Sequence, residues 1–225
     1  MEDRDHLLVV NPNSNAETTA VMARLGGRAL AGTGLAVRAV TALSGPRVIT
    51  GVADLEASVP HVLERVRHAA TSATRGIVVA AIGDPGVAQL RDQTAVPVVG
   101  LGEASVRAAS LRRRPFGMVT STVDLGPSLR ALIARHATAP FTGLRFTASP
   151  AHLLDADDAL TEHELREAIG ACIHGDGAET VIVGGGPLSR AAERIGRAHA
   201  GRIVEPVPSA VAYLLDALGV PAVAV

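Results

Sequence analysis

Three acidic residues stand where a carboxylate can take part in proton transfer. Asp84 lies in the loop 83–86, while Glu103 and Glu205 each follow a short apolar run. Such runs are typical of buried strands, and ligands of open parallel sheets bind at the carboxyl ends of their strands. A carboxylate there can act as a general acid or base. Asp84 followed by Pro85 also fits a helix N-cap with proline at the first helical position.

Short polar side chains occupy similar places after two other strand-like runs. Their amides and hydroxyls can hold a carboxylate or an imide, and they can equally form a turn and cap a helix. We expect them to bind substrate. They are Asn11, Asn13 and Ser14 in the first half of the chain and Thr120 and Ser121 in the second half.

Three consecutive glycines, Gly184, Gly185 and Gly186, follow a further strand-like run. Without side chains they can present backbone N–H groups to an anion or to an oxyanion that develops during a reaction. A tight turn between a strand and a helix is the alternative interpretation. We expect these glycines in the binding site.

Other motifs argue against a cofactor or a metal. Every one of the 21 basic residues is arginine, which excludes a lysine Schiff base, a pyridoxal anchor and a P-loop lysine. The run 100–105 ends in serine where a dinucleotide fingerprint has glycine, and it follows the fourth strand rather than the first. His61, Glu64 and His68 share a helical face, which we interpret as solvated. We expect no metal and no cofactor.

The elements that must position these residues alternate between strand and helix. β-Branched runs bounded by Gly, Pro or Asn alternate with Ala-, Leu- and Arg-rich stretches of helical period, which predicts an α/β fold with parallel sheets. Continuous apolar strands indicate burial on both faces. The predicted strands are Leu7–Val10, Leu35–Thr41, Gly76–Ala81, Val96–Gly100, Phe116–Thr120, Leu144–Thr147, Thr180–Val183 and Arg202–Glu205.

The second half of the chain repeats the spacing of the first. When Asn11 is matched to Thr120, Leu35 falls on Leu144, and the later strands follow in the same order. This register predicts two pseudosymmetric lobes, each a parallel sheet flanked by helices, with a ligand cleft between them. Residues 1–100 plus 206–225 would form lobe 1, and residues 101–205 would form lobe 2.

Composition limits the partners and the compartment. The 225 residues are 48% hydrophobic and carry a formal charge of −1, so no overall field attracts nucleic acid or an anionic membrane. There is no tryptophan, no apolar run long enough to span a membrane, and a single cysteine. We expect a cytoplasmic protein with a small-molecule substrate, no nucleic-acid or membrane partner, and a possible homo-oligomer.

Taken together, these segments resemble the Asp/Glu/hydantoin racemase superfamily, and more closely its hydantoin racemase branch, over nearly the whole chain. The resemblance implies two α/β lobes with a site between them and cofactor-free proton transfer at an acidic carbon. It is carried by Val9-Val10-Asn11-Pro12-Asn13-Ser14, Gly83-Asp84-Pro85-Gly86, the run Pro97 to Ala104, Val119-Thr120-Ser121 and Asp176-Gly177-Ala178-Glu179.

In that family two cysteines, one in each lobe, flank the acidic carbon. The resemblance places them at Ala81 and Gly185, which are equivalent positions of the internal repeat. Neither a methyl group nor a hydrogen can move a proton. We nevertheless expect Ala81, like Gly185, to line the substrate-binding site. Cys172 lies in an apolar helical stretch rather than at a strand end, so it does not replace either thiol.

Three hypotheses follow from this departure. The first is an isomerase that acts on a small carboxylate, amide or cyclic ureide through an enolate-type intermediate, with Asp84, Glu205 or Glu103 as acid or base; a lyase or decarboxylase on the same scaffold stays open. The second is a non-catalytic homologue that binds a small ligand. The third is a purely structural assembly.

Overall fold

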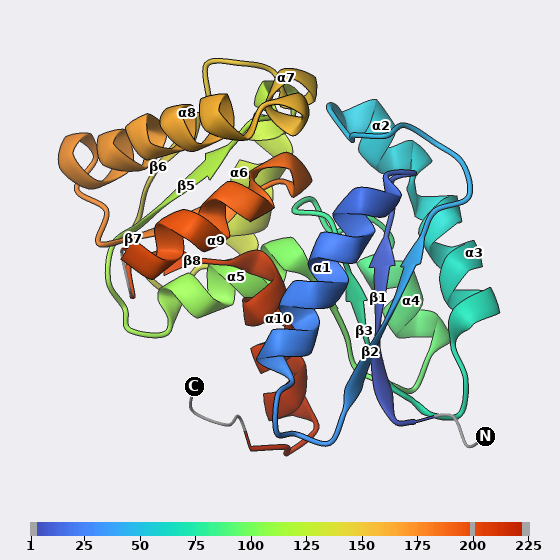
Figure 1. Cartoon of the computed structure of the whole chain (residues 1–225). Coiled ribbons are helices and arrows are strands. Elements are labelled where there is room, and N and C mark those ends of the chain that lie inside the picture. Colours follow the sequence, from blue (N-terminus) through green and yellow to red (C-terminus); the bar gives the residue numbers. More distant parts are fainter. Residues whose placement is uncertain (1–3, 199–200, 222–225) are drawn as a thin grey trace. The chain divides into compact units, whose positions relative to one another are not determined.

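The eight strand-like runs of the sequence all form strands, arranged in two four-stranded parallel sheets. The computed structural model describes residues 4–198 and 201–221 (Figure 1). The strand orders are β2-β1-β3-β4 and β6-β5-β7-β8. The α/β fold class is therefore confirmed. The strands are β1 (His6–Asn11), β2 (Ala36–Thr41), β3 (Thr74–Val79), β4 (Val98–Gly100), β5 (Phe116–Thr120), β6 (Phe141–Phe146), β7 (Thr180–Gly184) and β8 (Ile203–Val204).

The chain divides into two compact units, each of which contains one sheet. Unit 1 comprises Met1–Ile49, Ala53–Leu101 and Val207–Val225. Unit 2 comprises Thr50–Val52 and Gly102–Pro206. The internal duplication and the cleft expected between the lobes remain predictions.

In unit 1 helices cover both faces of the sheet. Leu8 and Ile77 point to one face, where they pack with residues of α3 and α4. On the other face, the position of a Cβ on Gly76 lies 3.1 Å from the side chain of Leu214 in α10. Asn15 begins α1 by accepting hydrogen bonds from the backbone N–H groups of Glu17 and Thr18. These helices are α1 (Ala16–Ala29), α2 (Val52–Ala57), α3 (Val59–Ala69), α4 (Val87–Gln93) and α10 (Pro206–Ala217).

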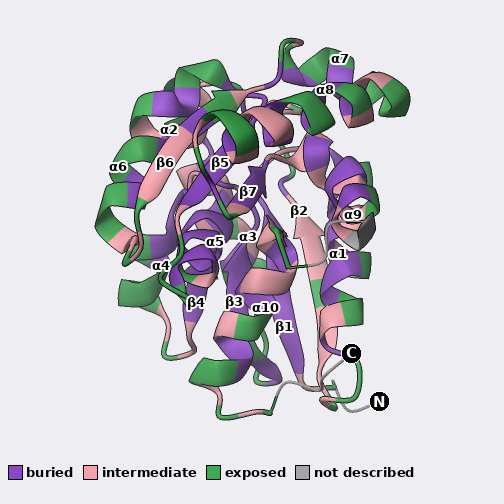
Figure 2. Ribbon diagram, turned by 90° about the vertical axis from the view of Figure 1, so that its left-hand side faces the viewer, coloured by how far each residue is buried: buried purple, intermediate pink, exposed green. Residues whose placement is uncertain are grey.

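In unit 2 the core lies between the sheet and the helices α8 and α9. Val119 and Val181 pack with Leu165 and Ile169 of α8 and with Ile195 of α9. Figure 2 shows β5 and β7 as largely buried and β6 as mostly intermediate. The helical elements of this part of the chain are α5 (Leu101–Ser110), η1 (Val123–Leu125), α6 (Gly126–His136), α7 (Ala151–Ala156), α8 (Asp158–Gly170), η2 (Ala171–Gly175), η3 (Gly186–Leu188) and α9 (Ser189–Ala198).

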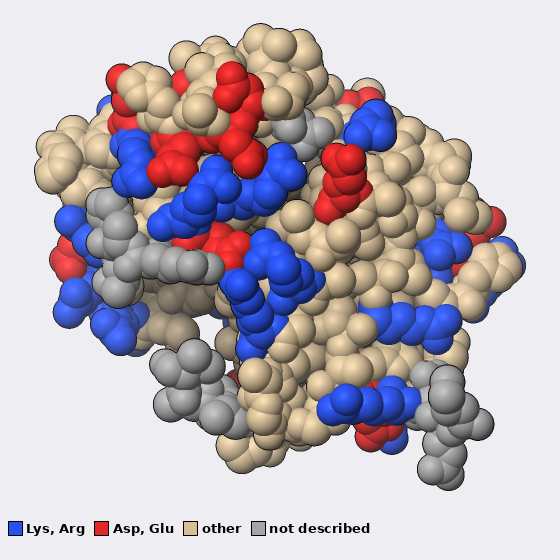
Figure 3. Space-filling view, in the orientation of Figure 1, with Lys and Arg blue, Asp and Glu red and all other residues tan. Residues whose placement is uncertain are grey.

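The charges on unit 2 are paired rather than segregated. Glu162 of α8 accepts hydrogen bonds from Arg166, on the same helix, and from Arg194 of α9. Figure 3 shows acidic and basic side chains next to one another over α8 and α9. The two arginines hold the pKa of the Glu162 carboxyl below its ordinary value. Among the described residues, no helix is long and apolar enough to cross a membrane.

Candidate functional site

Asn11 ends β1 and organises the turn that follows it. Its side chain is fully buried, and Nδ2 donates to Asn13 Oδ1 at 2.9 Å, to Thr19 Oγ1 at 2.9 Å and to the Asn15 carbonyl at 3.1 Å. These three acceptors occupy both protons of the amide. Asn11 therefore holds the turn in shape, and its side chain does not present a donor to a ligand.

Asn13 is the residue of this turn whose side-chain amide can donate a hydrogen bond to a ligand. Its Oδ1 accepts from Asn11 and from the backbone N–H of Asn15, whereas no described residue accepts a hydrogen bond from its Nδ2. Ser14 donates from Oγ to the Gly45 carbonyl at 3.0 Å, which ties the turn to the loop after β2. Of the three predicted binding residues in this turn, Asn13 is the one whose polar group is left for a substrate.

Asp84 lies beyond the end of β3 in a conformation that non-glycine residues seldom adopt. Its φ is 55°, in the left-handed region, and Gly86 also has a positive φ of 78°. A Cβ at Gly100 would collide with the Asp84 carboxyl group, so that carboxyl occupies the space over the end of β4, where α5 begins. A helix N-terminus favours negative charge.

This geometry corrects the N-cap interpretation of Asp84 and Pro85. Helix α4 begins at Val87 and its N-cap residue is Gly86. Asp84 contributes only its backbone carbonyl, which accepts from the N–H of Val87 at 3.4 Å, and its side chain is not the N-cap. Instead, the backbone N–H of Asp84 donates to the carbonyl of Ala81 at 3.1 Å, which places Ala81 in the same turn at the end of β3.

The two other candidate carboxylates face groups within unit 2. Glu103, with 3% of its surface exposed, accepts from Arg107 Nε at 2.9 Å and lies 3.9 Å from His136 Nδ1. Glu205 follows β8, and its Oε1 lies 3.3 Å from the position of a Cβ on Gly196 in α9. The ion pair of Glu103 favours a structural role, whereas Asp84 and Glu205 both lie beyond strand ends.

The hydroxyl groups after β5 differ in their hydrogen bonding. Thr120 and Thr122 are buried and hydrogen-bond to each other through Oγ1 at 3.1 Å. Ser121 has 6% of its surface exposed, and its buried Oγ has no hydrogen-bond partner among the described residues. A buried hydroxyl without a partner costs free energy, so Ser121 marks a place where a ligand would restore a hydrogen bond.

The glycine loop after β7 lies beside this hydroxyl. Gly185 has φ 128° and ψ 135°, a conformation that L side chains rarely adopt. A Cβ at Gly185 would lie 3.7 Å from Ser121 Oγ and 3.8 Å from Thr120 Oγ1, at ordinary contact distance. A Cβ would therefore fit in the space at position 185, and it is the backbone conformation that favours glycine there.

A cavity of about 240 Å³ adjoins Ser121. Its remaining walls come from Thr122 and from residues that the sequence did not single out: Thr50, Val123, Asp124 and the segment 147–152 after β6. The strand-end rule could have found the last segment, because β6 ends at Phe146 and Thr147 follows it. Thr50 is far from this wall in sequence, and only the tertiary fold brings it there.

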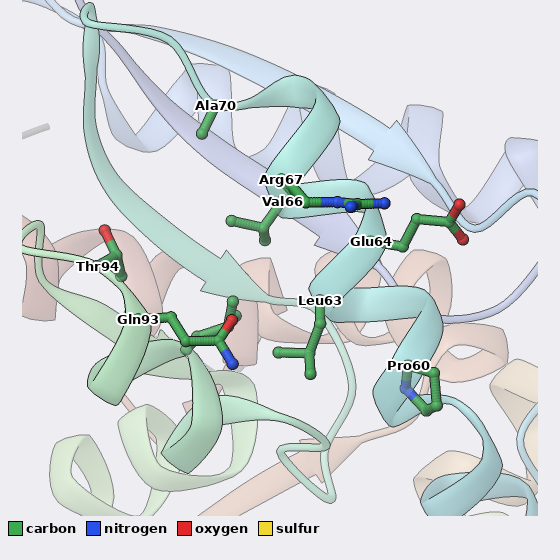
Figure 4. Close-up of a pocket in the computed structure, with 9 residues that line it drawn as sticks. Pro60, Leu63, Glu64, Val66, Arg67, Ala70, Gln93 and Thr94 are labelled. Carbon is green, nitrogen blue, oxygen red and sulfur yellow. The ribbon is translucent and has the colours of Figure 1, made fainter.

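A larger cavity, of about 530 Å³, lies in unit 1 between α3 and α4. Figure 4 shows Leu63 and Val66 of α3 facing it, with Gln93 and Thr94 on the other side. None of the predicted site residues lines this cavity. We therefore do not assign the reaction to it.

The single cysteine lies beside the middle of β5 rather than at a strand end. Cys172 is fully buried in the core of unit 2, with its Sγ 3.9 Å from the Met118 carbonyl. Burial raises the pKa of its thiol to about 11, and the nearby Asp176 carboxylate adds to this effect. The thiol is therefore neutral at physiological pH and is a poor nucleophile or base.

Comparison with known proteins relates these features to a family. The family model described as Asp/Glu/Hydantoin racemase matches residues 7–214. The hydantoin racemase of Paenarthrobacter aurescens is 28% identical over 217 residues, which cover 95% of this chain and 92% of that protein. The hydantoin racemase of Rhizobium meliloti is 28% identical over 221 residues, which cover 95% of this chain and 89% of that protein.

Comparison with solved structures also finds racemases. Allantoin racemase from Klebsiella pneumoniae superposes with a TM-score of 0.84 at 26% identity, covering 97% of this chain and 90% of the other. Glutamate racemase RacE1 from Bacillus anthracis superposes with a TM-score of 0.66 at 16% identity, covering 97% of this chain and 83% of the other, and shares the fold.

Proposed function

Because the chain belongs to the Asp/Glu/hydantoin racemase family, we propose that it is a racemase-type isomerase that moves a proton at the acidic carbon of a small molecule. The substrate class is a small carboxylate, amide or cyclic ureide. Relatives named hydantoin racemase and similar structures named allantoin racemase support the cyclic ureide within this class. The family match over residues 7–214 is the observation that carries the proposal.

The reaction divides into removal and return of a proton. A base takes the proton from the carbon next to a carbonyl group, and the electron pair moves onto the carbonyl oxygen to form an enolate-type intermediate. Hydrogen-bond donors that face this oxygen lower the barrier. Return of a proton from solvent water to the opposite side of the same carbon gives the other stereoisomer, and the base then releases the proton that it took to solvent.

In this chain the base must be something other than a thiol. The sequence contains one cysteine, and Cys172 is fully buried. Two flanking thiols are therefore not available. We assign proton removal to Asp84, whose carboxyl is fixed at the end of β4, with Ser121 Oγ and the N–H groups of the loop 184–186 as candidate donors to the oxygen.

A carboxylate requires help to act on carbon. An exposed carboxyl has a low pKa and is a weak base, so water must be excluded when the substrate binds. The chain has no lysine, which removes an amine base and a pyridoxal anchor from consideration. The proposed reaction accordingly uses neither of these groups.

A non-catalytic homologue is the second candidate. The specific observation in its favour is the pair of residues Ala81 and Gly185 at the positions where the resemblance places the family's two cysteines. A protein of this kind would bind the same small carbonyl compounds without turnover. A lyase or decarboxylase is a variant of the first proposal, since loss of carbon dioxide leads to the same enolate-type intermediate.

Solvent deuterium incorporation distinguishes these candidates. The purified protein is incubated in D₂O with hydantoins, allantoin, aspartate, glutamate and substituted malonates, and the signal of the proton on the acidic carbon is followed by NMR. The isomerase predicts enzyme-dependent loss of that signal for at least one compound, and a decarboxylase predicts release of carbon dioxide. Binding of a compound without exchange or decarboxylation would favour the non-catalytic homologue.

A further inference from the structure

Unit 2 contains a buried carboxylate that is bound to a serine rather than to a cation. Glu164 of α8 has 7% of its surface exposed. Its Oε1 accepts a hydrogen bond from Ser149 Oγ at 2.5 Å, and its Oε2 accepts one from the backbone N–H of Ser149 at 2.8 Å. In the described part of the chain, no ion pair joins Glu164 to an arginine or a histidine.

A carboxylate in this place costs free energy that a structural tie does not require. Buried charges in proteins are normally paired with an opposite charge. Glu103 follows this rule, because Arg107 Nε donates to it at 2.9 Å. A neutral amide at position 164 could hold the Ser149 N–H without burying a charge. The carboxylate therefore points to chemistry at the Ser149 hydroxyl.

Ser149 faces the cavity that adjoins Ser121, and both residues line it. The backbone N–H of Thr147 donates to the carbonyl of Thr120 at 3.1 Å, so the segment that carries Ser149 runs beside the residue before Ser121. A hydroxyl oxygen has two lone pairs, and no described residue donates a hydrogen bond to Ser149 Oγ. This oxygen can accept a proton from a ligand in the cavity while it donates its own proton to Glu164.

We propose that Ser149 and Glu164 form a proton relay, which is a second acid–base group of the reaction beside Asp84. This inference rests on the proposed function, because it acts on the same acidic carbon. When the relay removes a proton, the C–H bond breaks and its proton moves to Ser149 Oγ. The hydroxyl proton of Ser149 moves at the same time to Glu164 Oε1, and the electron pair of the broken bond moves onto the carbonyl oxygen of the substrate. Glu164 ends neutral, and Ser149 ends as a hydroxyl.

The reverse sequence returns a proton to carbon. Neutral Glu164 donates its proton to Ser149 Oγ, the hydroxyl proton of Ser149 forms the new C–H bond, and the electron pair of the enolate returns to carbon. The relay thus takes the place of solvent water as the immediate proton donor. Asp84 removes the proton of one stereoisomer and the relay removes that of the other, and each of them exchanges its proton with solvent afterwards.

The two enantiomers of one substrate test the relay separately. Each enantiomer of 5-methylhydantoin is incubated in D₂O with protein, and loss of the proton signal at the ring carbon is followed by NMR and corrected for the rate without protein. Glu164→Gln keeps an acceptor for the Ser149 N–H but cannot take up a proton. Exchange of one enantiomer should fall by about 10²-fold or more. The other enantiomer should still exchange without inversion, because Asp84 returns a deuteron from solvent to the side from which it took the proton.

Two further variants separate the relay from a structural role. Ser149→Ala keeps the hydrogen bond from the backbone N–H to Glu164 and removes the hydroxyl, so it should show the same one-sided loss. Thr161→Val is the control. Thr161 Oγ1 lies 2.6 Å from the carbonyl of Leu154 and 2.7 Å from that of Asp157, so it ties the same segment to α8 without lining the cavity. Its loss should lower the melting temperature and leave the ratio of the two exchange rates unchanged.

Rates are expressed per folded molecule, and if either relay variant fails to fold, the other decides the question. One-sided loss supports the relay. If the wild type exchanges both enantiomers while the relay variants lose both equally or neither, the isomerase stands and the relay is wrong. If the wild type exchanges neither enantiomer, the result overturns the isomerase and the relay together.

Discussion

At the scale of single residues, Asp84 combines an unusual backbone conformation with a fixed carboxyl group. Its φ of 55° costs free energy that the surrounding structure must offset. The carboxyl takes the place that a side chain at position 100 would occupy, and glycine there makes this possible. Strain of this kind often occurs at functional sites, which supports Asp84 as the proposed base.

Asp84→Asn is expected to slow deuterium exchange by about 10²-fold or more, because an amide cannot accept the proton. Asparagine tolerates the left-handed region as well as aspartate does, so the melting temperature should change little. Asp92→Asn, an exposed change on α4, serves as the control and should exchange at the wild-type rate. An unchanged exchange rate in the Asp84 variant would assign the proton transfer to another group.

The buried thiol of Cys172 is expected to make the free energy of unfolding depend on pH. Burial raises the pKa of its thiol from 9.0 to about 11, so in this range the thiol ionises in the unfolded chain and stays neutral in the folded chain. The stabilising contribution is fully present below pH 9 and is lost as the pH rises to about 11. By itself it amounts to about 2 to 3 kcal/mol of unfolding free energy.

The measurement for Cys172 is urea unfolding at pH 8 and pH 10.5. Cys172→Ala should be less stable at pH 8, by about 1 to 2 kcal/mol, because a buried sulfur is lost. It should also lose less stability than the wild type between the two pH values. Parallel behaviour of the two proteins would show that the thiol is accessible to ionisation in the folded state.

At the scale of elements, the junction of β4 and α5 positions Asp84. Gly100→Ala places a methyl group where the Asp84 carboxyl lies, so the carboxyl must move. We expect a loss of about 1 to 3 kcal/mol of stability from overpacking and a fall in the exchange rate of about tenfold or more.

Gly27 of α1 offers the matched control for this change. A Cβ there meets nothing within 4 Å, so Gly27→Ala should stabilise the protein by about 0.5 to 1 kcal/mol and leave exchange unaltered. If Gly100→Ala keeps the wild-type exchange rate despite a lower melting temperature, the position of the Asp84 carboxyl does not matter for the reaction.

The strands were predictable because their apolar runs are short, continuous and bounded by turn residues. The main difference is β6, which begins at Phe141 rather than Leu144. Phe141 packs against Phe116 of β5 with ring centroids 5.5 Å apart, a contact between residues distant in sequence. Period and composition do not reveal such a contact, so the start of this strand was missed.

The site was predictable in outline and not in detail. The strand-end rule placed Asp84, Ser121 and the loop 184–186 at the ends of strands, because it depends on topology alone. The rule does not show that the Asn11 amide donates its hydrogen bonds to Asn13, Asn15 and Thr19, or that Ser121 Oγ lacks a hydrogen-bond partner. Those facts depend on side-chain geometry that only the folded chain specifies.

At the scale of the whole molecule, the two sheets repeat one strand order, β2-β1-β3-β4 and β6-β5-β7-β8. Unit 1 contains the proposed base, Asp84, and unit 2 contains Ser121 and the loop 184–186, which hold the proposed oxyanion donors. Internal duplication, a cytoplasmic location and a homo-oligomeric state remain predictions from the sequence.

The central claim is that a member of this family transfers protons at carbon without thiols, and one measurement tests it most directly. Cys172→Ala leaves the chain with no cysteine at all. We predict that this variant, incubated in D₂O with the best substrate of the wild type, still incorporates deuterium at the acidic carbon at the wild-type rate per folded molecule. Exchange by the wild type that disappears in the folded Cys172→Ala variant would contradict the account.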